Sequence, residues 1–203
     1  MRVLALFAAL LPGLPALAQD LPALFSVTGV AADDRLNLRA GPSADADAVG
    51  ALGPDATGVE VVETTDDGRW GRVNVGEGAA WAAMRYLVAE PGPDWHAMAR
   101  PLSCYGTEPF WSLAIPPDAA PLRLERMGEA VEALPRTLTS PAFDWPRSVG
   151  IGLDGPRGPG FSVIRAETCT DGMSDRVMGL SLRMFLAGPS GTESYLGCCT
   201  LAR

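Results

Sequence analysis

Four cysteines are the residues of this chain best suited to covalent chemistry: Cys104, Cys169, Cys198 and Cys199. A structural zinc site or a redox dithiol normally shows a C-x-x-C pair, and the sequence contains none. A cysteine nucleophile would need a histidine partner. An even cysteine count without these features is typical of structural disulfides.

The doublet Cys198-Cys199 limits how these disulfides can form. A bond between the two neighbours would close a strained small ring, so this connectivity is disfavoured. Cys104 should therefore pair with one member of the doublet and Cys169 with the other. Adjacent side chains of a strand point to opposite faces, so the doublet could staple both faces of one strand.

Carboxylates near these cysteines are candidate binding groups. If two of Glu108, Asp171 and Asp175 converged, the pKa of one would rise and give an acid/base pair, and all three could hold Ca²⁺ through oxygen. The alternative, which we favour, is that Asp171 and Ser174 cap turns through backbone amides. Trp111 could line a ligand pocket or fill the end of a barrel.

Basic residues exclude several classes of enzyme. All 16 are Arg, so a P-loop lysine and Schiff-base catalysis are excluded. The single histidine, His96, excludes zinc sites that need several histidines. It would also have to serve any Cys-His or Ser-His nucleophile. We therefore expect no catalytic residues, no metal and no cofactor.

The N-terminus has the layout of a cleavable export signal. Arg2 precedes an apolar run from Val3 to Leu11, a Pro/Gly break and the sequence Ala16-Leu17-Ala18. We expect cleavage after Ala18, so residues 1–18 are a signal peptide and the mature protein is periplasmic or secreted. No later apolar run is long enough to span a bilayer, which predicts no membrane insertion after cleavage.

The formal net charge is −8. Negative charge repels phosphate backbones and anionic lipid headgroups. We therefore expect neither nucleic acid nor a membrane surface as a partner.

Residues 24–90 show short alternating runs separated by turn signals. Leu36 to Ser43 ends at Gly41-Pro42, and Arg69 to Val75 follows the turn Asp66-Asp67-Gly68. Several short strands of this kind predict a small barrel or sandwich.

Two segments of this region, "LNLRAGPS" (36–43) and "GRWGRVNVGEGAAWAAMRYL" (68–87), resemble the bacterial SH3 (SH3b) domain. The resemblance implies an SH3-like barrel that binds peptidoglycan, peptides or an envelope protein. The matching positions are Leu36, Leu38, Arg39, Gly41, Pro42, Trp70, Val73, Trp81, Tyr86 and Leu87. Ala80-Trp81-Ala82 stands where Gly-Trp-Val is usual in the family.

Four of the matching residues are ligand-binding candidates. Trp70, Trp81 and Tyr86 could form an aromatic groove, and Arg39 could bind a carboxylate through two hydrogen bonds. In the alternative interpretation Trp70 and Trp81 fill the barrel core and Arg39 pairs with a nearby Asp.

Residues 91–101 are rich in Pro and predict a linker. Residues 102–203 predict a second antiparallel barrel or sandwich, with Trp111, Leu113 and Ile115 on one face of a strand. Gly128 to Leu134 is the one helix-like segment. The expected fold is therefore all-β: a small SH3-like barrel joined by a short linker to a second β-barrel or sandwich stapled by disulfides.

The motifs "CYGTEPFW", "CTDGMSD" and "GCC" of this second region resemble an uncharacterised bacterial envelope domain, sometimes found beside SH3b. The resemblance carries no assigned activity. The motif positions are Cys104, Gly106, Glu108, Pro109, Phe110, Trp111, Cys169, Asp171, Gly172, Met173, Ser174, Asp175, Gly197, Cys198 and Cys199.

The leading functional hypothesis is an exported, non-enzymatic envelope protein. Its SH3b region would bind cell-wall peptide or a protein partner, and its C-terminal domain a second partner or a small ligand. One alternative is a cell-wall hydrolase, or a hydrolase-associated protein, targeted by SH3b. The other is an inhibitor of a lysozyme or protease.

Overall fold

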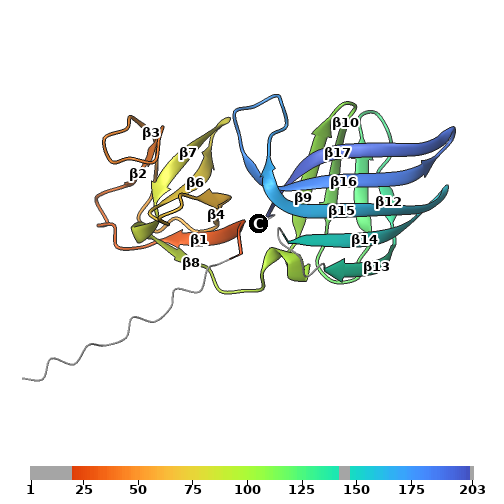
Figure 1. The fold of residues 1–203 in the computed structure, drawn as a ribbon, viewed down its shortest axis with the longest axis horizontal. Helices are drawn as coiled ribbons and strands as arrows, with labels where there is room; N and C mark the ends of the chain where they lie inside the picture. Colours follow the sequence, from red (N-terminus) through yellow and green to blue (C-terminus); the bar gives the residue numbers. More distant parts are fainter. Residues whose placement is uncertain (1–19, 142–146, 202–203) are drawn as a thin grey trace, which may run out of the picture.

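The computed structural model describes residues 20–141 and 147–201. The expected signal peptide lies outside these residues. The described chain forms two β domains side by side, with two short 3-10 helices (Figure 1). The predicted all-β fold is therefore confirmed. Neither 3-10 helix, nor any other helix in the described ranges, has the length and apolar character needed to cross a membrane.

The N-terminal domain consists of two small antiparallel sheets. The first has the order β4-β1-β8 and the second β3-β2-β7-β6-β5. The elements are β1 (Ala23–Val27), β2 (Leu36–Arg39), β3 (Ala48–Leu52), β4 (Val59–Val61), β5 (Glu63–Thr64), β6 (Trp70–Val75), β7 (Gly78–Ala83), η1 (Met84–Tyr86) and β8 (Leu87–Ala89).

Alternation of side chains builds the core of this domain. In β2, Leu36 and Leu38 are buried while Asn37 is exposed, as expected for a strand with one face on a core. The core also contains Phe25 and Leu87, together with small and β-branched side chains such as Val61, Val73 and Ala82. Glu60, which lies between buried neighbours in β4, is therefore directed away from this core.

The C-terminal domain is one antiparallel sheet in the order β12-β11-β10-β9-β17-β16-β15-β14-β13. Its strands are β9 (Leu102–Thr107), β10 (Phe110–Ile115), β11 (Leu122–Arg126), β12 (Glu132–Leu134), β13 (Arg136–Pro141), β14 (Ser148–Gly155), β15 (Gly158–Cys169), β16 (Met178–Gly188) and β17 (Gly191–Leu201). Each strand pairs with the next in the chain except at β12 and β13, and the last strand, β17, pairs with the first, β9.

The sheet curls into a nearly closed barrel. Its two edge strands, β12 and β13, are separated only by Pro135, which has no amide hydrogen to continue a ladder. The carbonyl of Pro135 instead accepts a hydrogen bond from the amide of Asp154 at 2.9 Å. Gly155 at the end of β14 lies against Leu134 of β12. The predicted helical segment from Gly128 to Leu134 was wrong, because it forms a turn followed by β12.

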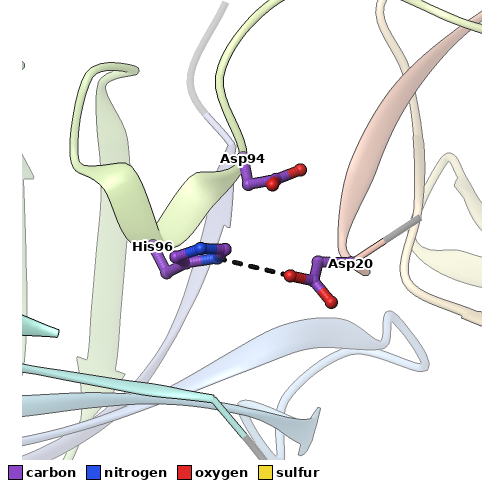
Figure 2. A group of neighbouring side chains, drawn as sticks. All are labelled: Asp20, Asp94 and His96. Atoms are coloured by element: carbon purple, nitrogen blue, oxygen red, sulfur yellow. Dashed lines mark ion pairs between the residues drawn. The ribbon is translucent and has the colours of Figure 1, made fainter. Parts of the chain in front are cut away.

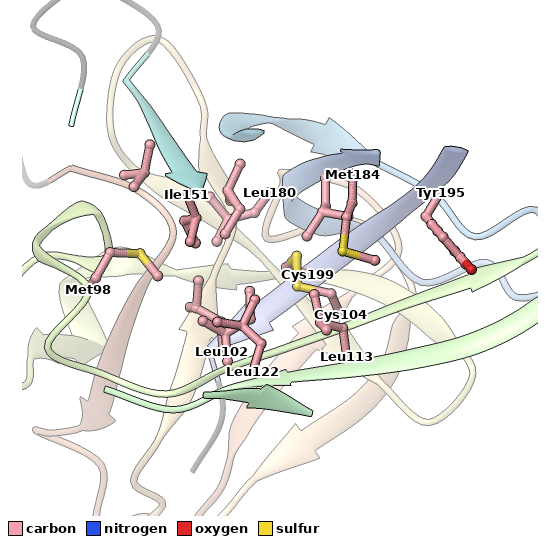
Figure 3. Close-up of a cluster of buried hydrophobic side chains, with 14 of the residues drawn as sticks. Met98, Leu102, Cys104, Leu113, Leu122, Ile151, Leu180, Met184, Tyr195 and Cys199 are labelled. Atoms are coloured by element: carbon pink, nitrogen blue, oxygen red, sulfur yellow. A yellow bond between two sulfur atoms is a disulfide. The ribbon is translucent and has the colours of Figure 1, made fainter. Parts of the chain in front are cut away.

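Apolar side chains fill the barrel interior (Figure 3). In β10, Trp111, Leu113 and Ile115 are buried while Phe110 and Ser112 are exposed, which confirms the predicted alternation. The buried side chains of the other strands are mainly Leu, Ile, Val and Met. The interior is therefore a packed core.

The disulfides join Cys104 to Cys199 and Cys169 to Cys198. The first lies among the buried side chains (Figure 3), and both of its cysteines have no exposed surface. Cys169 of the second is half-buried on the outside of the sheet. The doublet thus staples both faces of β17, as the strand geometry predicted.

Part of the segment 91–101 packs into the C-terminal core. The 3-10 helix η2 (Trp95–Ala97) buries Trp95 to 1% exposure, and Met98 is buried beside it. The guanidinium of Arg100 donates to the carbonyls of Pro91 and Pro93, which ties the segment to itself. Trp95 therefore belongs to the second core although it precedes the first strand of that domain.

We predict that Trp95→Ala lowers the free energy of unfolding by about 4 kcal/mol, because it removes a fully buried aromatic side chain. Arg100→Ala is the matched control from the same segment and should cost less than about 1 kcal/mol, because this half-buried side chain makes only surface hydrogen bonds. Urea denaturation of both variants measures the difference. Equal, small losses in the free energy of unfolding of both variants would mean that the segment does not stabilise the domain.

We predict that a mild phosphine reductant opens Cys169–Cys198 before Cys104–Cys199 in the folded protein, because only the first is accessible from outside. Alkylation during native reduction, followed by peptide mass mapping, should find Cys169 labelled first. Simultaneous labelling of Cys104 would contradict the burial of its disulfide.

Candidate functional site

A groove of about 390 Å³ opens on the surface of the N-terminal domain. Its polar and aromatic lining comes from the loop before β2, from β2 itself, from the start of β6 and from η1. The main contributors are Asp34, Arg35, Arg39, Trp70, Arg85 and Tyr86. Three of the four candidates predicted in this domain, Arg39, Trp70 and Tyr86, are thus brought together.

The guanidinium groups of the three groove arginines have no carboxylate within 4 Å among the described residues. Arg39 donates to the carbonyl of Ala46 at 3.0 Å, so the expected salt bridge with an Asp is not formed. The guanidinium of Arg85 lies 4.7 Å from the ring centroid of Tyr86, which fits a cation–π contact. Cationic groups without an acidic partner are suited to bind an anion.

The other two arginines of this domain are paired. Arg69 forms an ion pair with Asp67, and Arg72 with Glu63 at 2.8 Å. The guanidinium of Arg72 also lies 5.7 Å from the ring of Trp81. Trp81 does not line the groove. The unpaired cations of this domain are thus concentrated at the groove.

Trp70 and Trp81 are both half-buried. The interpretation that these rings fill the barrel core was therefore wrong. The central positions of β6 and β7 are taken by Val73, Ala80 and Ala82, which are almost fully buried. Trp70 accordingly offers part of its ring to the groove.

Candidates of the C-terminal domain do not form one site. Glu108 is exposed in the turn between β9 and β10. Asp175 is exposed, and its amide donates to the carbonyl of Glu77 in the N-terminal domain at 2.9 Å. Trp111 is buried inside the barrel, edge-on to Tyr195 with the ring centroids 5.7 Å apart. Trp111 therefore serves the core.

Asp171 caps a turn, the alternative that we favoured. Its carboxylate accepts from the amides of Met173 and Ser174 at 3.0 and 2.9 Å, and also from the Ser174 hydroxyl. These hydrogen bonds, led by the amide of Ser174, lower the pKa of Asp171. The carboxylate therefore holds the loop between β15 and β16 in shape.

Asp20, Asp94 and His96 form the one group of three metal-ligating side chains within 4.8 Å of one another in the described ranges (Figure 2). The Nδ1 atom of His96 lies 3.7 Å from a carboxylate oxygen of Asp20. The same oxygen is in an ion pair with Arg147. Because this arginine already neutralises Asp20, the group acts as an ion-pair cluster that ties the start of the described chain to the C-terminal domain.

Sequence reasoning missed Arg35 and Arg85 as groove residues. Both lie next to positions of the SH3b motif, Leu36 and Tyr86, and both are exposed. Charge alone could not distinguish them from the paired Arg69 and Arg72. Only the fold separates the arginines that have acidic neighbours from those that do not.

Residues 34–88 match the family model described as the bacterial SH3 domain. The match covers the groove apart from its edge at Gly29 to Ala31. Neither the curated proteins nor the solved structures contain a match to this chain. The C-terminal barrel must therefore be interpreted from its own geometry.

We predict that Asp171→Ala lowers the free energy of unfolding by about 1 kcal/mol at neutral pH, because two backbone amides lose their acceptor. The folded pKa is lowered, so the carboxylate stabilises fully above its ordinary value of 3.8 and loses this effect as the pH falls through the lowered value. The difference in free energy of unfolding between Asp171→Ala and wild type should therefore decrease as the pH falls through this range.

Asp171→Asn is the control for this prediction, because its amide oxygen can still accept a hydrogen bond. Thermal denaturation as a function of pH measures both variants. A loss in Asp171→Ala that stays constant into the acid range would contradict the capping role.

Proposed function

We propose that this protein is a non-enzymatic binding protein of the bacterial cell envelope. In this proposal the groove of its bacterial SH3 domain binds an extended peptide that carries carboxylates, such as the stem peptides of peptidoglycan. The observation that carries the proposal is the set of three arginines, Arg35, Arg39 and Arg85, lining one groove without carboxylate partners in the described chain.

The chemistry of the groove supports a carboxylate ligand. A guanidinium binds a carboxylate through two parallel hydrogen bonds, and its weak hydration makes this exchange with water favourable. Trp70 and Tyr86 add flat apolar surface on which a peptide chain can lie. Three arginines in one groove make it locally positive, although the formal net charge of the chain is −8.

Location in the envelope is supported by two observations. The first 18 residues have the composition of an export signal. The two disulfides are of the kind that persists in an oxidising compartment.

The cysteines favour binding over hydrolysis. All four form disulfides, so none is a free thiol that could act as the nucleophile of a papain-like wall peptidase. Apolar side chains of the described strands fill the interior of the C-terminal barrel. A role of this domain in binding would therefore use its outer surface.

We predict that the mature protein co-sediments with purified peptidoglycan sacculi and that Arg85→Gln weakens this binding about tenfold, because one charge-assisted hydrogen bond is lost. Arg69→Gln is the matched control, because it removes the same charge from the same domain outside the groove. It should bind like wild type.

Sacculi whose carboxylates are converted to amides provide the second comparison. Binding should fall when the carboxylates are blocked. Equal binding to blocked and untreated sacculi, or equal losses in Arg85→Gln and Arg69→Gln, would contradict the assignment.

A further inference from the structure

A cleft of about 540 Å³ lies between the two domains. One wall comes from β4 and β6 of the N-terminal domain, and the other from β9, β17 and the residues before β16. The volume falls in the range of small-molecule sites, which often form at domain interfaces. None of the residues discussed for the groove lines this cleft.

Strand alternation places polar side chains in the cleft. In β9, Leu102 and Cys104 point into the barrel, so Ser103 and Tyr105 point outward. Glu60 of β4 likewise points away from the N-terminal core, between the buried Val59 and Val61. Both domains therefore turn polar positions toward the space between them.

Hydrogen bonds hold the two walls in a fixed relation. The carboxylate of Glu60 accepts from the hydroxyl of Thr200 at 2.6 Å and from the amide of Leu201 at 3.1 Å. The side-chain amide of Asn74 donates to the carbonyl of Val177 at 2.8 Å and accepts from its amide at 2.9 Å. A β-bridge between Gly78 and Asp175 adds a third link, and the segment between β15 and β16 reaches toward the N-terminal domain (Figure 1).

The cleft also contains the cation Arg176, whose guanidinium takes no part in these links between the domains. Its guanidinium forms no ion pair or hydrogen bond with any described residue, and its Nε is buried without a partner. Asp171, whose pKa Arg176 helps to lower, already accepts from Met173 and Ser174. A buried guanidinium hydrogen without an acceptor is costly, and a bound anion would supply the acceptor.

Tyr105 lies close enough to Arg176 and Glu60 for both charges to shift its pKa. Burial raises the pKa of Tyr105, and Arg176 and Glu60 shift it in opposite directions. The phenol therefore stays protonated at neutral pH and can donate a hydrogen bond. The cleft thus contains a cation, a hydroxyl donor and a carboxylate, with the apolar side chains of Val59 and Val73 between them.

We propose that this cleft is a binding site for a small molecule with a free carboxylate, of the size of a short peptide. The ligand carboxylate binds Arg176 and the hydroxyl of Tyr105. A cationic ligand without a carboxylate would be repelled by Arg176. The site is separate from the groove and does not depend on the proposed function.

The test is isothermal titration calorimetry of the full mature protein with trialanine. We expect saturable binding of one peptide, weakened at least about tenfold by Arg176→Gln because the charge-assisted bond is lost. Arg183→Gln, an exposed arginine of β16 outside the cleft, is the matched control and should bind like wild type.

Two modified peptides test the role of the carboxylate. Trialanine amide lacks the carboxylate and should bind more weakly than trialanine, whereas N-acetyltrialanine keeps it and should still bind. No binding of trialanine at about 10 mM, far above the Kd of a specific site, would overturn the proposal. Trialanine amide binding as well as trialanine would overturn it as well.

Further variants keep the test decisive. If Arg176→Gln unfolds, Tyr105→Phe removes only a hydroxyl and should weaken binding about threefold; unchanged binding would overturn the site. Arg85→Gln should leave trialanine binding intact, and Arg176→Gln should leave co-sedimentation with sacculi intact. A loss of trialanine binding in Arg85→Gln would place the peptide in the groove and overturn the cleft site.

Discussion

Pairing of β17 with β9, which joins the two halves of the C-terminal sheet, is the constraint on which the rest of the structure depends. The last strand returns to the first, and Cys199 lies opposite Cys104 in this pairing and is bonded to it. This contact fixes the ends of β9 and β17, where Ser103, Tyr105 and Thr200 face the N-terminal domain. Without it, Glu60 would lose the fixed donors of Thr200 and Leu201, and the cleft would have only one wall.

The groove of the N-terminal domain and the cleft between the domains present positive charge in the same way. In an acidic chain, a few arginines are held away from carboxylates, so their charge is available to a ligand. Arg39 is kept in place by a backbone carbonyl and Arg85 by a neighbouring ring, and neither contact neutralises the charge. Arg176 is held by its position in a loop that Asp171 caps. These arginines are held in place while their charge is not neutralised. Arg69 and Arg126, in contrast, form ion pairs.

Local sequence signals predicted the strands well, because alternation and turn residues act over a few positions. The alternation of Trp111, Leu113 and Ile115 in β10 is an example. The pairing of the cysteines stayed open because it depends on which face of β17 is turned inward. That choice depends on the register with β9, about a hundred residues away in the chain.

Features formed by distant segments could not be predicted. Proline on both sides of Trp95 indicated a linker, and only the barrel provides the core that buries this ring. Asn74, which lines the cleft, bonds to Val177, 103 positions later in the chain. No local sequence motif can therefore indicate the cleft. The groove was predicted in part: the SH3b motif contains Arg39, Trp70 and Tyr86, whereas Arg35 and Arg85 required the fold.

The central claim is that the unpaired arginines of the SH3 groove bind carboxylates of wall peptides. The most direct measurement is NMR of the arginine Nε–Hε signals of the full mature protein during titration with soluble muropeptides. We expect the signals of Arg35, Arg39 and Arg85 to shift with saturation while those of Arg69 and Arg72 stay unchanged. Unchanged groove signals, or equal shifts of all five arginines, would contradict it.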